Sequence, residues 1–190
     1  MKALEDKILS EGKIFDGGVL KVGGFLNQRI DACFIMEMGK EIARLYKDCG
    51  ITKIFTIESS GIAIAMAAAL EMGVPFVFAK KNKSTNVGDD VYTARVHSFT
   101  HGNTYDAVVS KEYLSSNDTV LIVDDFLARG NALVGLVDMV KQSGAKLAGA
   151  AIAIEKGFQG GGDELRRRGL RIEALALIEK MENGNIEFRG

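Results

Sequence analysis

Cysteine is scarce in this chain of 190 residues, which contains only Cys33 and Cys49. Two cysteines cannot form a four-ligand metal site, and their spacing is not that of a Cys-x-x-Cys motif. A disulfide between them is not expected in a reducing compartment. We therefore expect both residues to be ordinary buried thiols.

Long apolar runs are also missing. The longest unbroken apolar stretch is residues 62–70, whereas a helix needs roughly 20 apolar residues to cross a bilayer. Residues 1–12 are amphipathic and charged, without the apolar core and small-residue cleavage site of an export signal. These features predict a cytoplasmic protein that makes no use of a membrane.

Neither sign of charge is in excess. The chain has 24 Lys and Arg against 25 Asp and Glu, for a formal net charge of −1. This balance argues against a protein that coats nucleic acid, so no nucleic-acid partner is expected. Apolar residues make up 47% and charged residues 26%, as in ordinary globular proteins. At roughly 150 residues per domain, we expect a single domain over residues 1–190.

Several familiar motifs are absent. Neither GxxxxGK[ST] nor GxGxxG occurs, which weakens nucleotide hydrolase and dehydrogenase interpretations. The two histidines, His97 and His101, have no serine or cysteine partner in a recognisable catalytic motif. There is one proline but 22 glycines, several of them where predicted strands lead into helices. Glycines there suggest loops that approach a ligand closely.

The apolar periodicity predicts alternating strands and helices. Helices are expected at 2–11, 35–49, 62–72, 131–143 and 163–168, and strands at 51–57, 74–79, 91–99, 119–123 and 147–154, with two short strands around 182–185. Residues 13–34 fit neither pattern, and the polar stretch 80–90 is expected to be a mobile surface loop. This order favours an α/β fold with a mostly parallel twisted sheet flanked by helices.

The strongest functional signal is the segment VLIVDDFLARGNA at 120–132. It reads as a buried strand that delivers two partly exposed carboxylates, Asp124 and Asp125, to its end and then turns through small residues into a helix. Ligands bind at the carboxyl ends of parallel strands, and the start of a helix offers N–H groups to a phosphate. The carboxylates suit sugar hydroxyls or Mg²⁺, so the combination fits a sugar phosphate. The alternative is a solvated strand end followed by a helix cap.

Two further segments have the same placement near strand ends. Residues 58–61, with the sequence ESSG, join a strand to a helix, and their simplest alternative role is a helix N-cap. Lys80, Lys81 and Lys83 would form a solvated face in most proteins. Because the polar residues 84–90 follow them, we expect a lid that closes over substrate and excludes water.

Lys156 follows another buried strand, where its side chain could also snorkel to the surface. An ammonium group has three donors and no acceptor, so it suits an oxo group of a ligand and not an amino group. Asn27 can offer either its oxygen or its amide nitrogen. By itself Asn27 therefore cannot separate an oxo group of a ligand from an amino group.

The 120–132 segment resembles the signature of the type I phosphoribosyltransferases, and its FLAxG form resembles their bacterial xanthine-specific branch. The similarity extends to IESSGI at 57–62, FAKK at 78–81 and IEK at 154–156. In this resemblance Ala128, Arg129, Gly130, Asn131 and Ala132 bind the 5-phosphate of phosphoribosyl diphosphate (PRPP), Glu58, Ser59, Ser60 and Gly61 cradle its diphosphate, and Leu20, Asn27 and Lys156 contact the base. The family usually has Thr and Gly where this chain has Arg129 and Asn131, which puts PRPP affinity in question.

The resemblance implies transfer of the phosphoribosyl group from PRPP to xanthine, with Asp124 and Asp125 in the catalytic role. The Lys156 ammonium would then suit the 6-oxo group of xanthine, guanine or hypoxanthine and not the amino group of adenine, whereas Asn27 could not separate the 2-oxo group of xanthine from the 2-amino group of guanine. It also implies a homodimer, Mg²⁺ held mainly by PRPP without direct protein ligands, and a small hood over the purine built from about 1–35 and 155–190. Two alternatives remain. One is an enzyme that prefers guanine or hypoxanthine, and the other is a PRPP-sensing regulator without catalysis, for which the chain shows no DNA-binding surface.

Overall fold

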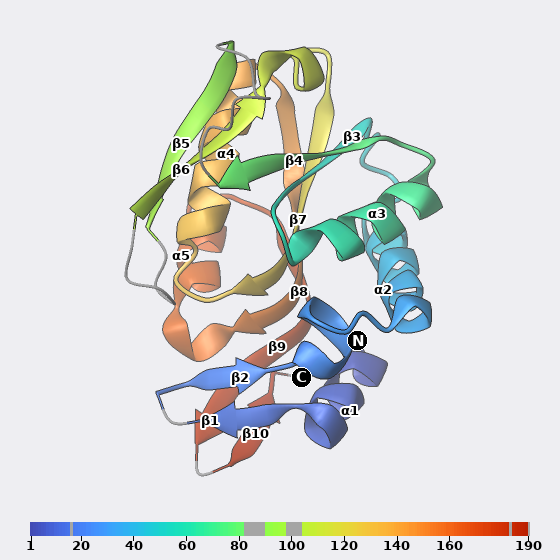
Figure 1. Ribbon diagram of the computed structural model, residues 1–190, viewed down its shortest axis with the longest axis vertical. Coiled ribbons are helices and arrows are strands. Elements are labelled where there is room, and N and C mark those ends of the chain that lie inside the picture. Colours follow the sequence, from blue (N-terminus) through green and yellow to red (C-terminus); the bar gives the residue numbers. More distant parts are fainter. Residues whose placement is uncertain (16, 82–89, 98–103, 183, 190) are drawn as a thin grey trace.

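A computed structural model describes residues 1–15, 17–81, 90–97, 104–182 and 184–189. Within these residues, one sheet of eight strands has the order β10-β9-β8-β7-β3-β4-β6-β5 (Figure 1). Its strands are β3 (Lys53–Ile57), β4 (Phe76–Lys81), β5 (Val91–His97), β6 (Thr104–Ser110), β7 (Thr119–Leu127), β8 (Lys146–Lys156), β9 (Ile172–Glu182) and β10 (Asn185–Phe188). The five strands from β9 to β4 pair in parallel, and β10, β6 and β5 pair antiparallel. The predicted mostly parallel sheet is confirmed.

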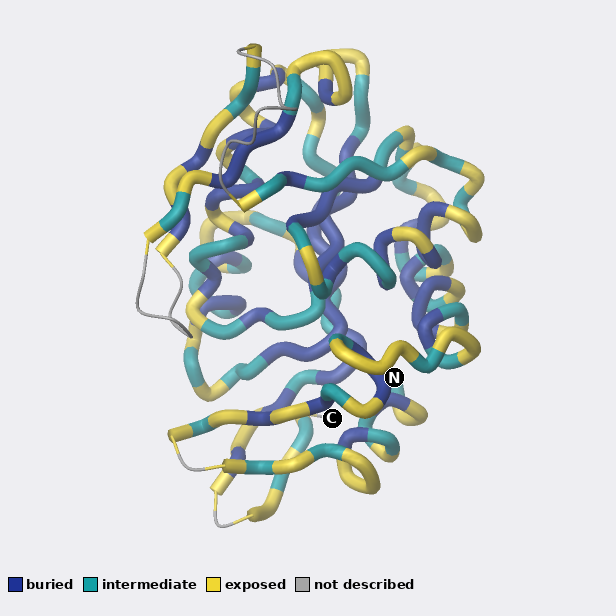
Figure 2. Tube along the Cα trace, in the orientation of Figure 1, coloured by how far each residue is buried: buried dark blue, intermediate teal, exposed yellow. Residues whose placement is uncertain are grey.

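Helices cover both faces of this sheet. They are α1 (Lys2–Glu11), α2 (Ala32–Leu45), α3 (Gly61–Met72), α4 (Asn131–Ser143) and α5 (Gly161–Arg167), with α2 and α3 on one side and α4 and α5 on the other (Figure 1). Alternation along β7 separates two cores: Leu121 and Val123 pack with α2 and α3, whereas Val120 and Ile122 pack with α4. Figure 2 shows the resulting buried segments running through the middle of the molecule.

Glycine fixes both ends of α4. Gly130 precedes the helix with a φ of 86°, and Gly144 follows it with a φ of 74°. Both angles lie in the left-handed region that favours glycine. The predicted bounds of this helix are therefore confirmed. Helix α2 starts earlier than its apolar spacing predicts, at Ala32, because the Asp31 carboxylate accepts a hydrogen bond from the Phe34 N–H and caps the helix.

Several local predictions are wrong. Lys80 and Lys81, predicted to begin a mobile loop, end strand β4 and pair with β6, and Cys49, predicted to be buried, is only half-buried. Residues predicted to be irregular form an antiparallel hairpin of β1 (Lys13–Phe15) and β2 (Val19–Lys21), followed by a π-helical turn over Gly23–Asn27. Strand β6 had no predicted counterpart, and β9 is a long strand because it pairs with β8 and β10 on its two edges. Cys33 is exposed, since it lies on the outer face of α2.

The two ends of the chain pack together (Figure 1). Leu4 and Ile8 of α1 share a core with Ile178 and Met181 of β9, and the amino group of Met1 donates to the Leu175 carbonyl. The turns of the β1–β2 and β9–β10 hairpins flank a hollow of about 290 Å³, lined by Ile14, Phe15, Gly17, Gly18, Met181, Glu182 and Gly184. The N-terminal and C-terminal segments thus form one structural unit at one end of the sheet.

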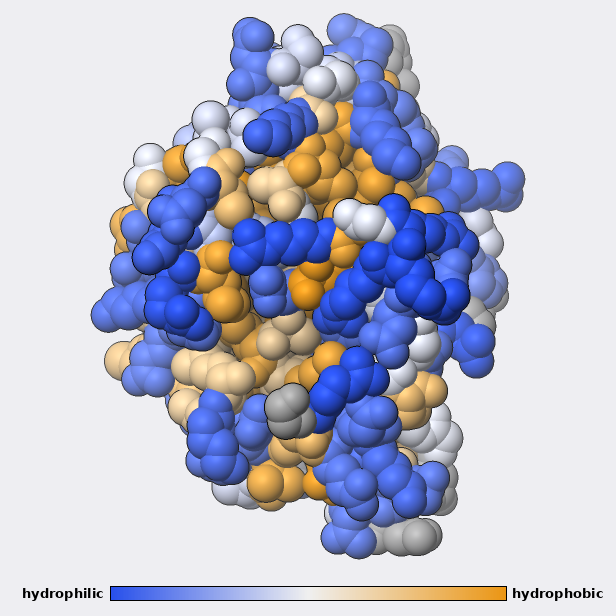
Figure 3. Space-filling model, turned by 180° about the vertical axis from the view of Figure 1, so that it is seen from behind, coloured by the Kyte–Doolittle hydropathy of each residue, from blue (hydrophilic) through white to orange (hydrophobic). Residues whose placement is uncertain are grey.

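The surface is mixed in character. On the face turned away in Figure 1, patches of apolar side chains are separated by charged ones (Figure 3). Within the described parts of the chain, no helix combines the length and apolar character required to span a membrane.

Candidate functional site

The loop at 128–132 follows β7 and leads into α4. Its backbone is packed from one side by α5: a Cβ on Gly161 would lie 2.4 Å from the Ala128 carbonyl oxygen, and one on Gly130 would lie 3.0 Å from Leu165 Cδ1. The Asn131 side chain turns to β5, where its Nδ2 donates to the His97 carbonyl over 3.1 Å. Close packing by α5 and the bond from Asn131 to β5 help to shape the loop, consistent with a phosphate site made mainly from backbone N–H groups.

The acid pair lies just before this loop, but its two members differ in exposure. Asp124 is only 6% exposed, whereas Asp125 is partly exposed. The prediction of two partly exposed carboxylates is thus wrong for Asp124, because β7 continues its parallel pairing with β8 as far as Leu127. Burial, and secondarily the Asp125 carboxylate, raises the pKa of Asp124 well above its usual range. Its Oδ1 accepts a hydrogen bond from the Asp125 N–H over 2.9 Å.

The start of α3 lies directly against Asp124. A Cβ on Gly61 would lie 2.1 Å from Thr56 Oγ1 and 3.0 Å from Asp124 Oδ1, so only glycine fits there. Thr56 Oγ1 is buried and has no hydrogen-bond partner among the described residues. The structure therefore brings the 58–61 segment and the acid pair to one edge of the sheet, as the sequence predicts.

The remaining residues of this segment connect it to β4. Glu58 donates its N–H to the Ala79 carbonyl over 3.0 Å, and its Oε1 accepts from the Lys81 N–H over 2.5 Å. Ser60 occupies the N-cap position of α3, yet its side chain makes no capping hydrogen bond. The helix-cap alternative for the serines at 59 and 60 thus lacks the contact that would support it.

Two predicted purine contacts lie near the end of β7, Asn27 at Asp125 and Lys156 at Phe126. Asn27, the last residue of the π-helical turn, places its Nδ2 3.5 Å from Asp125 Oδ2. Lys156 Nζ donates to the Gly18 carbonyl over 2.9 Å and lies 5.4 Å from the centre of the Phe126 ring. Its ammonium group therefore does not snorkel to the surface, and burial lowers the pKa of Lys156.

Leu20 is placed differently. It is 6% exposed in β2, and its Cδ1 would lie 3.3 Å from a Cβ on Gly12 at the end of α1. No described polar contact links it to Asn27 or Lys156. Its predicted contact with the base remains a prediction.

Two further residues lie near Asp124: Lys81, which the sequence singled out only as part of the predicted lid, and Tyr105, which it did not single out. The positive charge of Lys81 opposes the rise in the pKa of Asp124, and Lys81 Nζ lies 5.6 Å from the centre of the Tyr105 ring. The pKa of Tyr105 is raised by burial and by the nearby Asp124 charge. The place of Lys81 beside the acid pair could have been predicted, because the neighbouring parallel strands β3 and β4 end at the same edge. Tyr105 could not, since it lies on the unpredicted β6.

Part of the predicted lid lies outside the described residues, as do Lys83 and His101. Of the 84–90 stretch only Asp90 is described, and it forms an ion pair of 2.6 Å with Lys111. No group of three or more His, Cys, Asp or Glu side chains arranged to hold a metal occurs in the described part of the chain.

Comparisons with known proteins agree on one family. A family model described as the phosphoribosyl transferase domain matches residues 31–181. A xanthine phosphoribosyltransferase of Heliobacterium modesticaldum is 55% identical over 188 residues, which are 99% of this chain and 100% of the relative, and one of Bacillus mycoides is 52% identical, covering 99% and 95%. The structure of a Giardia lamblia adenine phosphoribosyltransferase with 9-deazaadenine has a TM-score of 0.78 at 23% identity and covers 94% of this chain and 98% of that one, which supports the fold. The chain therefore belongs to the phosphoribosyl transferase domain family, as its resemblance predicts.

Proposed function

We propose that this protein transfers the 5-phosphoribosyl group of PRPP to N9 of xanthine, giving xanthosine 5′-monophosphate and diphosphate in purine salvage. The observation that carries this proposal is the convergence of Asn27 and Lys156 on Asp125 and Phe126. Two candidate base-recognising groups thus lie near neighbouring residues at the end of β7, Asn27 beside Asp125 and Lys156 beside Phe126, which supports the proposal. The names of the relatives that match over 99% of the chain support the same substrate.

Different segments would hold the 5-phosphate, the diphosphate and the purine. Backbone N–H groups of the 128–132 loop would bind the 5-phosphate, and the 58–61 segment would cradle the diphosphate. The purine would lie under a hood made by the hairpin β1–β2 and the C-terminal strands. There the Lys156 ammonium would donate to the 6-oxo group, and the Asn27 amide would meet the 2-position.

Catalysis would depend on positioning and charge. As the bond between C1 of the ribose and the diphosphate oxygen breaks, the diphosphate takes the electron pair and the sugar becomes cationic and resembles an oxocarbenium ion. N9 of the base then bonds to C1, and the imidazole ring of the base releases its proton to solvent. Asp125 is the described carboxylate that remains accessible beside the loop, so its charge would stabilise this cation. The buried Asp124 would hold the Asp125 backbone in place by accepting a hydrogen bond from its N–H group.

Mg²⁺ fits this arrangement as an ion carried by PRPP. Asp125 offers the hard oxygen atoms that Mg²⁺ prefers, whereas the buried Asp124, with its raised pKa, is a poor ligand. We therefore expect the ion to be held mainly by PRPP oxygens, with Asp125 near the ribose hydroxyls. When bound, the ion would offset the negative charge of the departing diphosphate.

The substrate proposal is tested by measuring PRPP turnover with xanthine, guanine, hypoxanthine and adenine. We expect the largest kcat/KM with xanthine and the smallest with adenine. A preference for guanine or hypoxanthine would show that xanthine is the wrong base but that phosphoribosyl transfer is the right reaction. PRPP binding without turnover of any purine would instead favour the regulator.

We further propose a homodimer that uses an exposed face of α3. This helix is apolar along nearly its whole length, yet Met66 is 53% and Leu70 is 69% exposed. A helix that is apolar all round is normally buried, and a second copy of the chain would cover it. Leu70→Glu is expected to convert a dimer of 20.5 kDa chains to monomers in sedimentation experiments, whereas Leu9→Glu on α1 should not. A monomeric parent protein, or a dimer unaffected by Leu70→Glu, would contradict this surface.

A further inference from the structure

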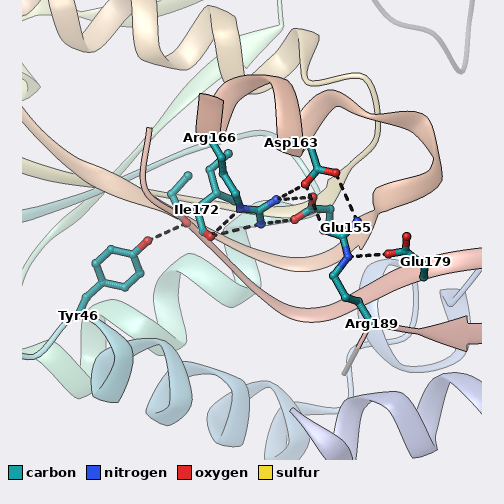
Figure 4. Close-up of polar contacts among 8 residues, drawn as sticks. Tyr46, Glu155, Asp163, Arg166, Ile172, Glu179 and Arg189 are labelled. Atoms are coloured by element: carbon teal, nitrogen blue, oxygen red, sulfur yellow. Dashed lines mark hydrogen bonds and ion pairs between the residues drawn. The ribbon is translucent and has the colours of Figure 1, made fainter. Parts of the chain in front are cut away.

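A buried ion pair connects the strand that carries Lys156 to α5. Glu155 is 0% exposed, and Arg166 binds it through two parallel bonds, Nη1 to Oε1 at 2.8 Å and Nη2 to Oε2 at 2.6 Å (Figure 4). Arg166 also donates to the Ile172 carbonyl at the start of β9. A buried ion pair adds little stability over apolar side chains of similar size. The two parallel hydrogen bonds of this pair, however, restrict how β8 and α5 can move relative to each other.

Glu155 stands next to Lys156 and opposite the phosphate-type loop. In the sheet it pairs with Leu127, the last residue before that loop. Successive side chains of a strand leave it on opposite faces, so Glu155 reaches α5 while Lys156 reaches Gly18 and Phe126. Fixing the Glu155 side chain therefore fixes the backbone from which Lys156 departs.

Helix α5 contacts both substrate-binding segments. Its first residue, Gly161, presses on the Ala128 carbonyl, and a Cβ on Gly162 would lie 2.0 Å from Glu155 Oε1. Because Gly161 and Gly162 have no side chains, the 128–132 loop can pack closely against Gly161 and the Glu155 carboxylate closely against Gly162. Arg166 lies on the same helix and binds Glu155 through its guanidinium group.

The outer part of the network has a different character. Asp163 lies 3.4 Å from Arg166 and 3.1 Å from Arg189, and Arg189 pairs with Glu179 over 2.5 Å. Asp163, Glu179 and Arg189 are between 39% and 50% exposed, so solvent screens these pairs. Only the inner pair of Glu155 and Arg166 is sheltered enough to set a fixed geometry.

We propose that Arg166 is a positioning residue for purine recognition, which holds Lys156 in place through its forked ion pair with Glu155. The proposal rests on the proposed function, in which Lys156 meets the base. It assigns a role in the choice of purine to a residue that touches neither substrate.

The test replaces the pair by a neutral one. Arg166→Gln alone would leave a buried carboxylate without its counter-charge and could prevent folding, so the main variant is Glu155→Gln with Arg166→Gln. For the double variant we expect KM for xanthine to rise about tenfold and KM for PRPP to change less than twofold. Arg166→Lys keeps the charge but loses the two parallel hydrogen bonds, so its KM for xanthine should lie between those of the parent protein and the double variant. Arg167→Gln is the matched control, because Arg167 also lies on α5 and pairs with an acid, Glu164, without touching Glu155.

A second measurement does not depend on turnover. Lysine side chains labelled by ¹³C reductive methylation can be titrated by NMR, with the Lys156 signal assigned from Lys156→Arg. If the pair holds Lys156 in its half-buried position, the double variant should move the pKa of Lys156 toward the ordinary lysine value, and Arg167→Gln should not. A folded double variant with unchanged KM for xanthine and an unchanged Lys156 titration would overturn the proposal. A double variant whose only change is a lower melting temperature would also overturn the proposal. A parent protein that turns over no purine would instead count against the proposed function, while the titration would still test the positioning.

Discussion

Asp125→Asn is expected to lower kcat by about 10²- to 10³-fold while leaving KM for xanthine and PRPP nearly unchanged. The magnitude is that of removing one group aimed at transition-state charge. The charge on the sugar develops only as the diphosphate departs, so the carboxylate acts on the transition state more than on the bound substrates. Asparagine has the same shape and can still contact Asn27, which limits the structural effect.

Steady-state kinetics with thermal unfolding of the same samples would check this expectation. Asp138→Asn is the matched control, since Asp138 is an exposed acid on α4 that bonds only to Gln142 in the described structure. It should retain full activity. If Asp125→Asn kept its specific activity and melted early, the acid pair would be structural and the proposed mechanism wrong.

The buried member of the pair should behave differently. Asp124→Asn is expected to lower kcat by roughly tenfold, because it acts through Asp125, and at neutral pH to raise the free energy of unfolding. Burial and the neighbouring Asp125 raise the pKa of Asp124 in the folded protein. The folded state therefore binds its proton more tightly than the unfolded state, and the parent protein loses stability as pH rises from the unfolded value near 3.8 through the raised folded value. A neutral asparagine has no such loss.

The stability gain of Asp124→Asn should thus grow with pH across that window. Denaturant unfolding at pH 4 and at pH 7 would measure it, with Asp138→Asn again as the control. A gain that is equal at the two pH values, or a loss at pH 7, would show that the Asp124 carboxyl is satisfied by contacts other than those described.

Local sequence signals predicted those parts of the fold that depend on local interactions. The bounds of α4 follow from glycines that adopt left-handed backbone at both ends, and this preference belongs to the residue itself. The βαβ order follows from apolar periodicity. The strand β7 illustrates the limit: two acids after an apolar run read as a strand end, yet pairing with β8 continues through Asp124 to Leu127. Such pairing is set by residues distant in the chain.

Missed elements share a related cause. Strands β1 and β2 have three residues each, too few for alternation to be visible among the glycines around them. Nothing local indicates that their turn supplies the Gly18 carbonyl for Lys156, which lies 138 residues away in the sequence. The type of each candidate site residue could be inferred from chemistry. Its exposure and partners needed the tertiary structure.

Lys156→Ala is expected to lower kcat/KM for xanthine by one to two orders of magnitude. A hydrogen bond from a charged donor contributes roughly 1.5 to 3 kcal/mol, and a factor of ten corresponds to about 1.4 kcal/mol. The Gly18 carbonyl accepts one hydrogen bond from the Lys156 ammonium group. Two donors remain, so Lys156 can keep this bond while it donates to the 6-oxo group.

The loss should be selective. KM for PRPP should barely change, because Lys156 lies toward the hairpin and Phe126 and not toward the 128–132 loop. The small activity expected with adenine should not fall, since adenine has an amino group where the lysine needs an acceptor. Lys156→Met separates two contributions: it keeps the apolar stem over Phe126 and removes only the charge, so it should lose nearly as much xanthine turnover as Lys156→Ala.

The pH dependence gives a further check on the same residue. Burial lowers the pKa of Lys156, so the ammonium should lose its proton at a lower pH than an exposed lysine does. The advantage of the parent protein over Lys156→Met with xanthine should therefore be full at neutral pH and shrink as pH rises through the lowered pKa. A ratio that stays constant over the alkaline range, or a defect limited to PRPP binding, would mean that Lys156 supports the hood through Gly18 and does not recognise the base.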